Sequence, residues 1–121
     1  MKENLEVHVG DTLDDTGRRF IDAWRRLEKG KRLRERHLSF ESLEGLLSVL
    51  TPKRWELLKY VHSHRVRSVR DLSLQLKRGY RRVHDDVEAL ATAGLLERHG
   101  RVVRADYDGI NSTFRFDDSR Q

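Results

Sequence analysis

Basic side chains gather over a short segment in the second half of the chain. Four of the six residues in KRGYRR, from Lys77 to Arg82, are lysine or arginine. Arginine binds phosphate oxygens and also presents two parallel donors to the O6 and N7 atoms of guanine. A helix is predicted to begin at Tyr80, so its positive dipole and free N–H groups add to the attraction there. The segment therefore predicts contact with a nucleic acid.

The predicted DNA contacts continue on both sides of this segment. Arg81 and Arg82, in the first turn of the helix, are expected to read base edges in the major groove. Arg101 belongs to a predicted β-hairpin and is expected to touch the backbone or a narrow minor groove. The whole set comprises Ser68, Arg70, Lys77, Arg78, Tyr80, Arg81, Arg82, His84, Asp85, Arg98 and Arg101.

The arginines also have simpler interpretations. The arginines of the predicted helix could simply form its solvent-exposed face. Arg98, Arg101 and Arg104 flank the predicted hairpin tip, where charge also protects an exposed edge strand from pairing. Their position at the front of the third helix favours DNA contact for the helix arginines. Among the hairpin arginines, a wing contact is favoured most for Arg101.

Three other residues near the basic segment have two or more possible roles. Tyr80 could belong to the core or hydrogen-bond a phosphate, and is not expected to stack on a base. His84 could pair with Tyr80, with Glu88 or with a phosphate, and a structural role is favoured. Asp85 could accept from the N4 amine of cytosine or hold an arginine in place, and the second role is favoured.

No recognisable catalytic or metal-binding motif stands in the sequence. The chain has no cysteine, which excludes disulfides, thiolate metal sites and a thiol nucleophile. It also has no Gly-rich phosphate loop and no G-x-S-x-G sequence. His62 and His64 are two residues apart on a predicted helix, so their side chains point in different directions. We therefore expect no metal, no cofactor and no enzymatic activity.

Length and charge narrow the class of protein. A chain of 121 residues predicts one domain with at most a small appendage. The net charge of +5 arises after residue 50: residues 1–50 hold ten basic and ten acidic side chains, and residues 51–121 hold fifteen and ten. No apolar run approaches the roughly 20 residues of a membrane span, and the N-terminus lacks a signal-peptide pattern. We expect a cytoplasmic protein without a membrane partner.

The first 50 residues are predicted to form an extension of alternating strands and helices. Alternating apolar and polar residues indicate a strand, and capping residues at Thr12 and Ser42 indicate helix starts. The predicted elements are a strand over 5–9, a helix over 13–33, a strand over 37–41 and a helix over 42–50. The first strand is expected to pair with a strand near the C-terminus, within one chain or across two.

Residues 51–116 are predicted to form three helices followed by strands. Thr51 and Pro52 suit the N-cap and the first helical position, Ser68 opens a capping box, and Gly94 suits a left-handed C′ residue. The predicted elements are helices over 52–64, 69–76 and 80–93, a hairpin of strands over 95–98 and 101–105 linked at 99–100, and a last strand over 110–116.

Two helix faces in this region are predicted to lie inward. The first helix places Trp55, Leu58 and His62 on one face, with Leu57 and Val61 beside them. The third helix has four inner positions at helical spacing, namely Tyr80, Val83, Val87 and Leu90.

These elements predict an α+β, mainly helical fold. A short helix, a three-residue turn, a longer helix, a glycine and a hairpin follow one another in a winged helix-turn-helix. The short helix would hold the longer one so that its outer face enters a major groove about 12 Å wide. We assign residues 51–116 to this domain, residues 1–50 to a strand-helix-strand-helix extension that dimerises or binds a partner, and residues 117–121 to a polar tail.

The segment from TPKRWELLKYV to VVRADYDGI resembles the MarR-like winged-helix regulators. The matching features are TP-x-R at a helix start, SVRDL, L-x-R-x-Y, VH-x-DV-x-AL in the third helix and GL at the hairpin. The resemblance is strongest to small prokaryotic DNA-binding proteins with antitoxin-like regulatory roles. It covers residues 51–110 and implies a dimeric transcriptional regulator. MarR proteins dimerise through long terminal helices, whereas the C-terminus here is predicted to be a strand.

Two kinds of partner follow from these observations. The basic second half suits double-stranded DNA, and the neutral first half suits a protein. In the predicted helix over 13–33, Phe20, Trp24 and Leu27 share one face, which is either core or the interface of a homodimer. The two function classes are therefore a transcriptional repressor and an antitoxin-like module that neutralises a partner toxin and regulates its own operon.

Overall fold

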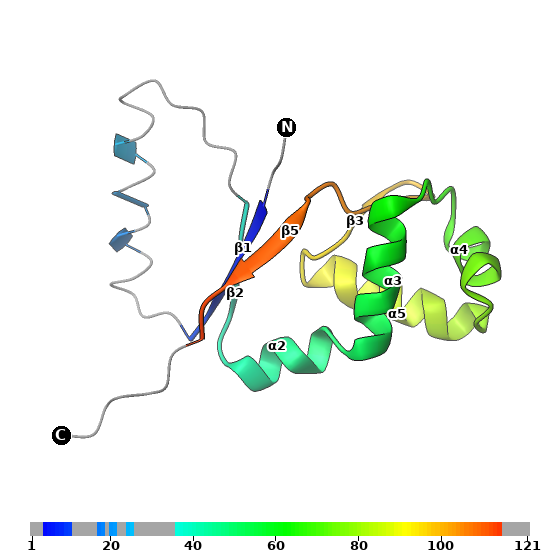
Figure 1. Cartoon of the computed structure of the whole chain (residues 1–121), viewed down its shortest axis with the longest axis horizontal. Coiled ribbons are helices and arrows are strands. Elements are labelled where there is room, and N and C mark those ends of the chain that lie inside the picture. Colours follow the sequence, from blue (N-terminus) through cyan, green and yellow to red (C-terminus); the bar gives the residue numbers. More distant parts are fainter. Residues whose placement is uncertain (1–3, 11–16, 19, 22–23, 26–35, 115–121) are drawn as a thin grey trace.

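The computed structural model describes residues 4–10, 17–18, 20–21, 24–25 and 36–114 (Figure 1). They form an α+β fold, and the described residues between 17 and 25 are helical. The other elements, in chain order, are β1 (Asn4–Val9), β2 (Arg36–Phe40), α2 (Leu43–Val49), α3 (Pro52–Ser63), α4 (Val69–Leu76), α5 (Tyr80–Thr92), β3 (Glu97–His99), β4 (Val102–Arg104) and β5 (Gly109–Ser112).

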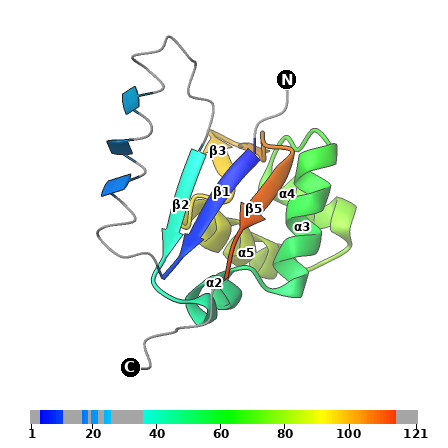
Figure 2. The same cartoon turned by 60° about the vertical axis from the view of Figure 1, so that its left-hand side comes forward.

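Strands β1, β2 and β5, which are distant in sequence, form a parallel sheet in the order β2-β1-β5 (Figure 2). The register aligns Leu5 with Arg36 of β2 and with Ile110 of β5. The predicted pairing of the first and last strands therefore occurs within one chain. This pairing joins the two ends of the described sequence. Alternation turns Leu5, Val7 and Val9 of β1 to one face, where Leu5 and Val7 are buried and Val9 is partly buried.

The last strand is shorter than predicted. β5 ends at Ser112, whose hydroxyl donates to the carbonyl oxygen of Val7 at 2.8 Å. Phe114 therefore lies beyond the strand and is exposed. Phe116, like Leu27, is outside the described residues.

One hydrophobic core joins the N-terminal strands to the later helices. Leu5, Val7 and Leu46 belong to the same buried cluster as the inner faces of α3, α4 and α5. Its largest fully buried members also include Leu57, Leu72, Leu90, Leu95, Val83, Val87 and Val103. Thr51 is the N-cap of α3, and buried residues on both sides of it belong to this one core. No helix in the described ranges is long and apolar enough to cross a membrane.

The inner face of α3 differs from the predicted one. Leu57, Leu58 and Val61 are buried, whereas Trp55 is exposed and lies under the Lys59 ammonium at 5.9 Å. At roughly 100° per residue, burying Leu57 turns Trp55 to the far side of the helix. The prediction that Trp55 points inward is therefore wrong.

Tyr107 links the segment after β4 to the segment that follows α5. Its hydroxyl donates to the carbonyl oxygen of Leu95 at 2.6 Å, and burial raises its pKa to about 12, although the nearby Arg36 guanidinium opposes this. Between pH 10 and 12 the unfolded chain releases the phenol proton while the folded chain retains it. The free energy of unfolding is therefore expected to fall as pH rises through this window.

Tyr107→Phe is expected to reduce the free energy of unfolding by about 1 kcal/mol at pH 9, because the hydrogen bond is lost. Because the variant has no phenol at position 107, its free energy of unfolding should fall less between pH 9 and pH 11 than that of the unaltered protein. Urea unfolding at pH 9 and pH 11 measures both effects. If the free energy of unfolding falls by the same amount between pH 9 and pH 11 in both proteins, the titration of Tyr107 does not contribute to the pH dependence of stability.

Candidate nucleic-acid interface

The turn between α4 and α5 is built by local backbone hydrogen bonds. The Ser68 hydroxyl caps α4 by accepting from the Asp71 N–H at 3.0 Å. Lys77 ends the helix in the left-handed conformation, with φ of 54°, and its N–H donates to the Leu74 carbonyl at 3.2 Å. Gly79 follows as the N-cap of α5. The three-residue turn therefore presents the side chain of Lys77 to solvent.

Burial of one face of α5 decides which side chains face outward. Val83, Val87 and Leu90 are fully buried. Since each helical residue advances by roughly 100°, Arg81 lies opposite Val83 and Arg82 lies beside it. Both arginines are exposed, and neither forms an ion pair with another described residue. They remain available to an external anion, as does the exposed Lys77.

Asp86 fixes the position of α5 through two arginines. Its carboxylate accepts from Arg54 Nε at 3.0 Å and from Arg78 Nη2 at 2.7 Å, and its side chain is only 14% exposed. Arg54 also donates to the Val49 carbonyl at the end of α2. Three helices and the turn therefore meet at this carboxylate.

These contacts correct two details of the predicted site. The arginine-holding carboxylate is Asp86, whereas Asp85 is exposed and has His84 Nδ1 3.8 Å away. Arg78 is held by Asp86 and is mostly covered, so its charge is already paired. At roughly 100° per residue, Asp86 lies beside the buried Leu90 and Asp85 lies on the opposite face of α5. The period does not indicate which arginines Asp86 binds, because Arg54 and Arg78 come from other elements.

Tyr80 is 44% exposed, which contradicts its predicted inward position. Its ring lies 5.1 Å below the Arg70 guanidinium and 5.9 Å from the ring of His84. As the first residue of α5, Tyr80 has no packed turn before it, so it rests on the surface against α4. His84 also lies 3.9 Å from Glu88, one of the partners considered for it from the sequence.

The β3–β4 hairpin projects near α5. Its strands pair Glu97 with Arg104 and His99 with Val102, so the two linking residues are Gly100 and Arg101. The predicted link was one residue earlier. Gly100 takes φ of +65°, and Arg101 occupies the tip itself, exposed to solvent.

The base of the hairpin is held from both sides. Val103 forms an antiparallel bridge with Val66, in the link between α3 and α4. Arg98 pairs with Glu88 of α5. Two further exposed arginines, Arg65 and Arg67, flank the bridge, and the sequence analysis did not identify them.

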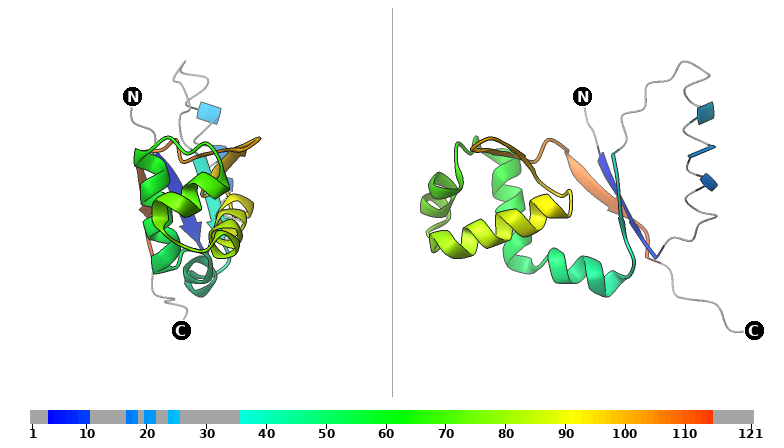
Figure 3. Two further views of the ribbon diagram at one scale, coloured as in Figure 1. Left: turned by 90° about the vertical axis from the view of Figure 1, so that its right-hand side faces the viewer. Right: turned by 180° about the vertical axis from the view of Figure 1, so that it is seen from behind.

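Viewed from the α4 side, α5 and the hairpin lie on the same flank of the domain, with α3 on the opposite flank (Figure 3). Lys77 at the end of α4, Arg81 and Arg82 at the start of α5, and Arg101 at the hairpin tip thus belong to neighbouring elements. Among the residues with a described position, no group of three His, Asp or Glu side chains could hold a metal ion.

The residues predicted for a core or a dimer interface belong to the helical stretch after β1. Phe20 is 70% exposed and Trp24 is 56% exposed. These exposures contradict the core interpretation for both residues. Leu27 lies outside the described residues.

A protein-family model, described only as HVO_A0114, matches residues 49–112. This is just over half of the chain, from the end of α2 to the end of β5, and it contains every predicted DNA contact. No curated protein and no solved structure matches the chain.

Proposed function

The chain belongs to the HVO_A0114 family, and we propose that it is a sequence-specific DNA-binding transcriptional regulator with a winged helix-turn-helix. In this proposal α5 enters the major groove and the hairpin is the wing. The observation that carries it is the set of unpaired cations on neighbouring elements, with Arg81 and Arg82 on α5 and Arg101 at the hairpin tip.

The order of the elements supports the winged-helix assignment. Helix α3, the bridging residue Val66, helices α4 and α5 and the hairpin follow one another as in that motif. A helix with its side chains is about 10–12 Å across, which suits a major groove about 12 Å wide. The ion pairs of Asp86 hold α5 against α3 and the turn, and this fixes the direction in which the outer face of α5 points.

We further propose that the regulator acts as a homodimer in the cytoplasm. Exposed Phe20 and Trp24 offer an apolar face to a second copy. A two-fold dimer would place two α5 helices about 34 Å apart, on successive turns of a pseudo-palindrome. The same face favours a second candidate function, in which an antitoxin-like chain binds a toxin there.

DNA binding is tested by selecting duplexes from a genomic library and titrating the best one at several salt concentrations. Each phosphate contact adds about 0.9 to the slope of log K against log salt, so several contacts predict a steep line. The complex is expected to hold two chains per duplex by analytical ultracentrifugation. No affinity for any duplex at low salt would overturn the proposal, and a single bound chain would overturn the dimer.

A further inference from the structure

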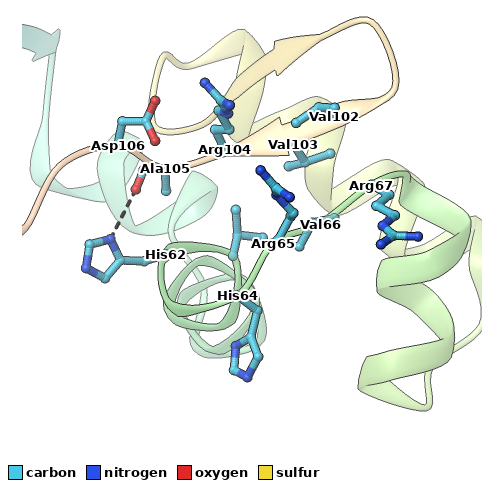
Figure 4. A pocket seen from close by; sticks show the side chains of 11 residues that line it. His62, His64, Arg65, Val66, Arg67, Val102, Val103, Arg104, Ala105 and Asp106 are labelled. Atoms are coloured by element: carbon cyan, nitrogen blue, oxygen red, sulfur yellow. Dashed lines mark hydrogen bonds between the residues drawn. The ribbon is translucent and has the colours of Figure 1, made fainter.

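A groove of about 600 Å³ separates the C-terminal end of α3 from strand β4 (Figure 4). Buried Val66 and Val103 lie at its base. Three exposed arginines, Arg65, Arg67 and Arg104, line it, and we call it the arginine groove. The side chains of these three arginines form no ion pair or hydrogen bond with another described residue.

The backbone places these arginines on one side. The Val103 N–H donates to the Val66 carbonyl at 3.3 Å, so the two extended segments lie side by side. Neighbouring residues in an extended chain point to opposite faces. Burial of Val66 and Val103 therefore turns Arg65, Arg67 and Arg104 outward together.

The carboxylates near this positive charge do not pair with it. Glu97 lies opposite Arg104 in the hairpin, but its carboxylate pairs with Arg36 at 2.7 Å. Asp106 is the one carboxylate in the lining, it is exposed, and it pairs with none of the three arginines in the described part of the chain. His62 is held by the Ala105 carbonyl at 3.1 Å, and His64 stacks on Tyr60. Unpaired guanidinium groups gathered on one rim repel one another unless an anion lies between them.

The arginine groove lies on the hairpin face turned away from α5. Arg98 shares the register of Val103 and pairs with Glu88 of α5, so that side of the hairpin faces the helix. Arg104, one position along, points to the other side. A wing in the minor groove, about 6 Å wide, has a sugar-phosphate strand on each side.

We propose that the arginine groove binds backbone phosphates of the DNA strand on the far side of the wing. This inference rests on the proposed function and extends it, since it adds a second line of phosphate contacts beyond α5 and Arg101. These contacts fix the register of the protein on the duplex and carry no base preference.

The test compares Arg65→Ala/Arg67→Ala/Arg104→Ala with a control of equal charge loss outside the groove, Arg25→Ala/Lys53→Ala/Lys59→Ala. The groove variant is expected to lower the salt slope by about 2 to 3, since each phosphate contact contributes about 0.9. It should weaken selected and scrambled duplexes alike and lose hydroxyl-radical protection on one flank of the wing contact. The control variant is expected to keep the slope and the footprint.

The outcomes separate this inference from the proposed function. If the unaltered protein binds no duplex, the proposed function itself fails. If it binds, but the groove variant keeps its slope and footprint or behaves like the control, the arginine groove is not a phosphate site. Arg104→Ala alone, expected to lower the slope by about 0.9, replaces the triple variant if circular dichroism shows that the triple variant is unfolded.

Discussion

Replacing Arg81 and Arg82 with alanine is expected to abolish most of the preference for a selected duplex over a scrambled one. A bidentate arginine–guanine contact is worth about 1–3 kcal/mol of discrimination, which corresponds to roughly 5- to 150-fold for each arginine. Both side chains are exposed on α5 and lack ion-pair partners in the described structure, so stability should change by less than about 0.5 kcal/mol. Titrations of both duplexes at several salt concentrations measure the preference.

Arg101→Ala is the matched control, because Arg101 is an equally exposed arginine at the hairpin tip. It is expected to weaken both duplexes evenly and to flatten the salt slope by about one unit. If the Arg81→Ala/Arg82→Ala variant weakens binding to the two duplexes equally, Arg81 and Arg82 are phosphate contacts. Base reading would then belong to Lys77 or Asp85.

Asp86→Ala is expected to destabilise the fold by about 1–3 kcal/mol. The substitution leaves the guanidinium groups of Arg54 and Arg78, each 22% exposed, without their shared carboxylate. A fully buried ion pair would cost more, about 3–5 kcal/mol, and the partial exposure here reduces the penalty. Urea unfolding followed by circular dichroism measures the change.

The neighbouring carboxylate provides the control for this experiment. Asp85 is exposed and holds no arginine, so Asp85→Ala should change the free energy of unfolding by no more than about 0.5 kcal/mol. Equal effects of the two substitutions would show that Asp86 does not anchor α5. A loss of stability for Asp85→Ala alone would show that the predicted assignment to Asp85 was right after all.

Helix starts could be predicted because their signals are local. Thr51 and Ser68 cap α3 and α4 by accepting from N–H groups three residues ahead. The left-handed turn at Gly94 is confirmed, with φ of +86°. A Cβ atom there would also lie 2.6 Å from the side chain of Leu38, a contact with β2 that no local pattern contains.

Positions at the boundary of a helix face could not be assigned from spacing alone. Tyr80 and Trp55 satisfy the helical period, yet both are exposed: Tyr80 is the first residue of α5, and Trp55 lies on the side of α3 away from the buried Leu57. The arginine partner of Asp86 could not be assigned either, because Arg54 is 32 residues from Asp86 in sequence. The partners of the candidate site are thus fixed by packing between elements.

The arginine groove depends on packing in the same way. Arg65 and Arg67 stand in a link between two predicted helices, where no period applies. Only the bridge between Val66 and Val103 brings them beside Arg104. Strand pairing between distant segments likewise gives the sheet its parallel direction, which alternation in sequence does not encode.

The central strand of the sheet, β1, is synthesised before both of its neighbours, and β5 follows it only after the helices and the hairpin. Glu6 and Asn111, whose side chains hydrogen-bond at 3.1 Å, are 105 residues apart. At about 5–20 residues per second, β5 follows β1 from the ribosome by roughly 5 to 20 seconds. Throughout that interval the nascent chain carries an open strand edge on β1, and closing so long a loop makes this pairing a late, slow step of folding.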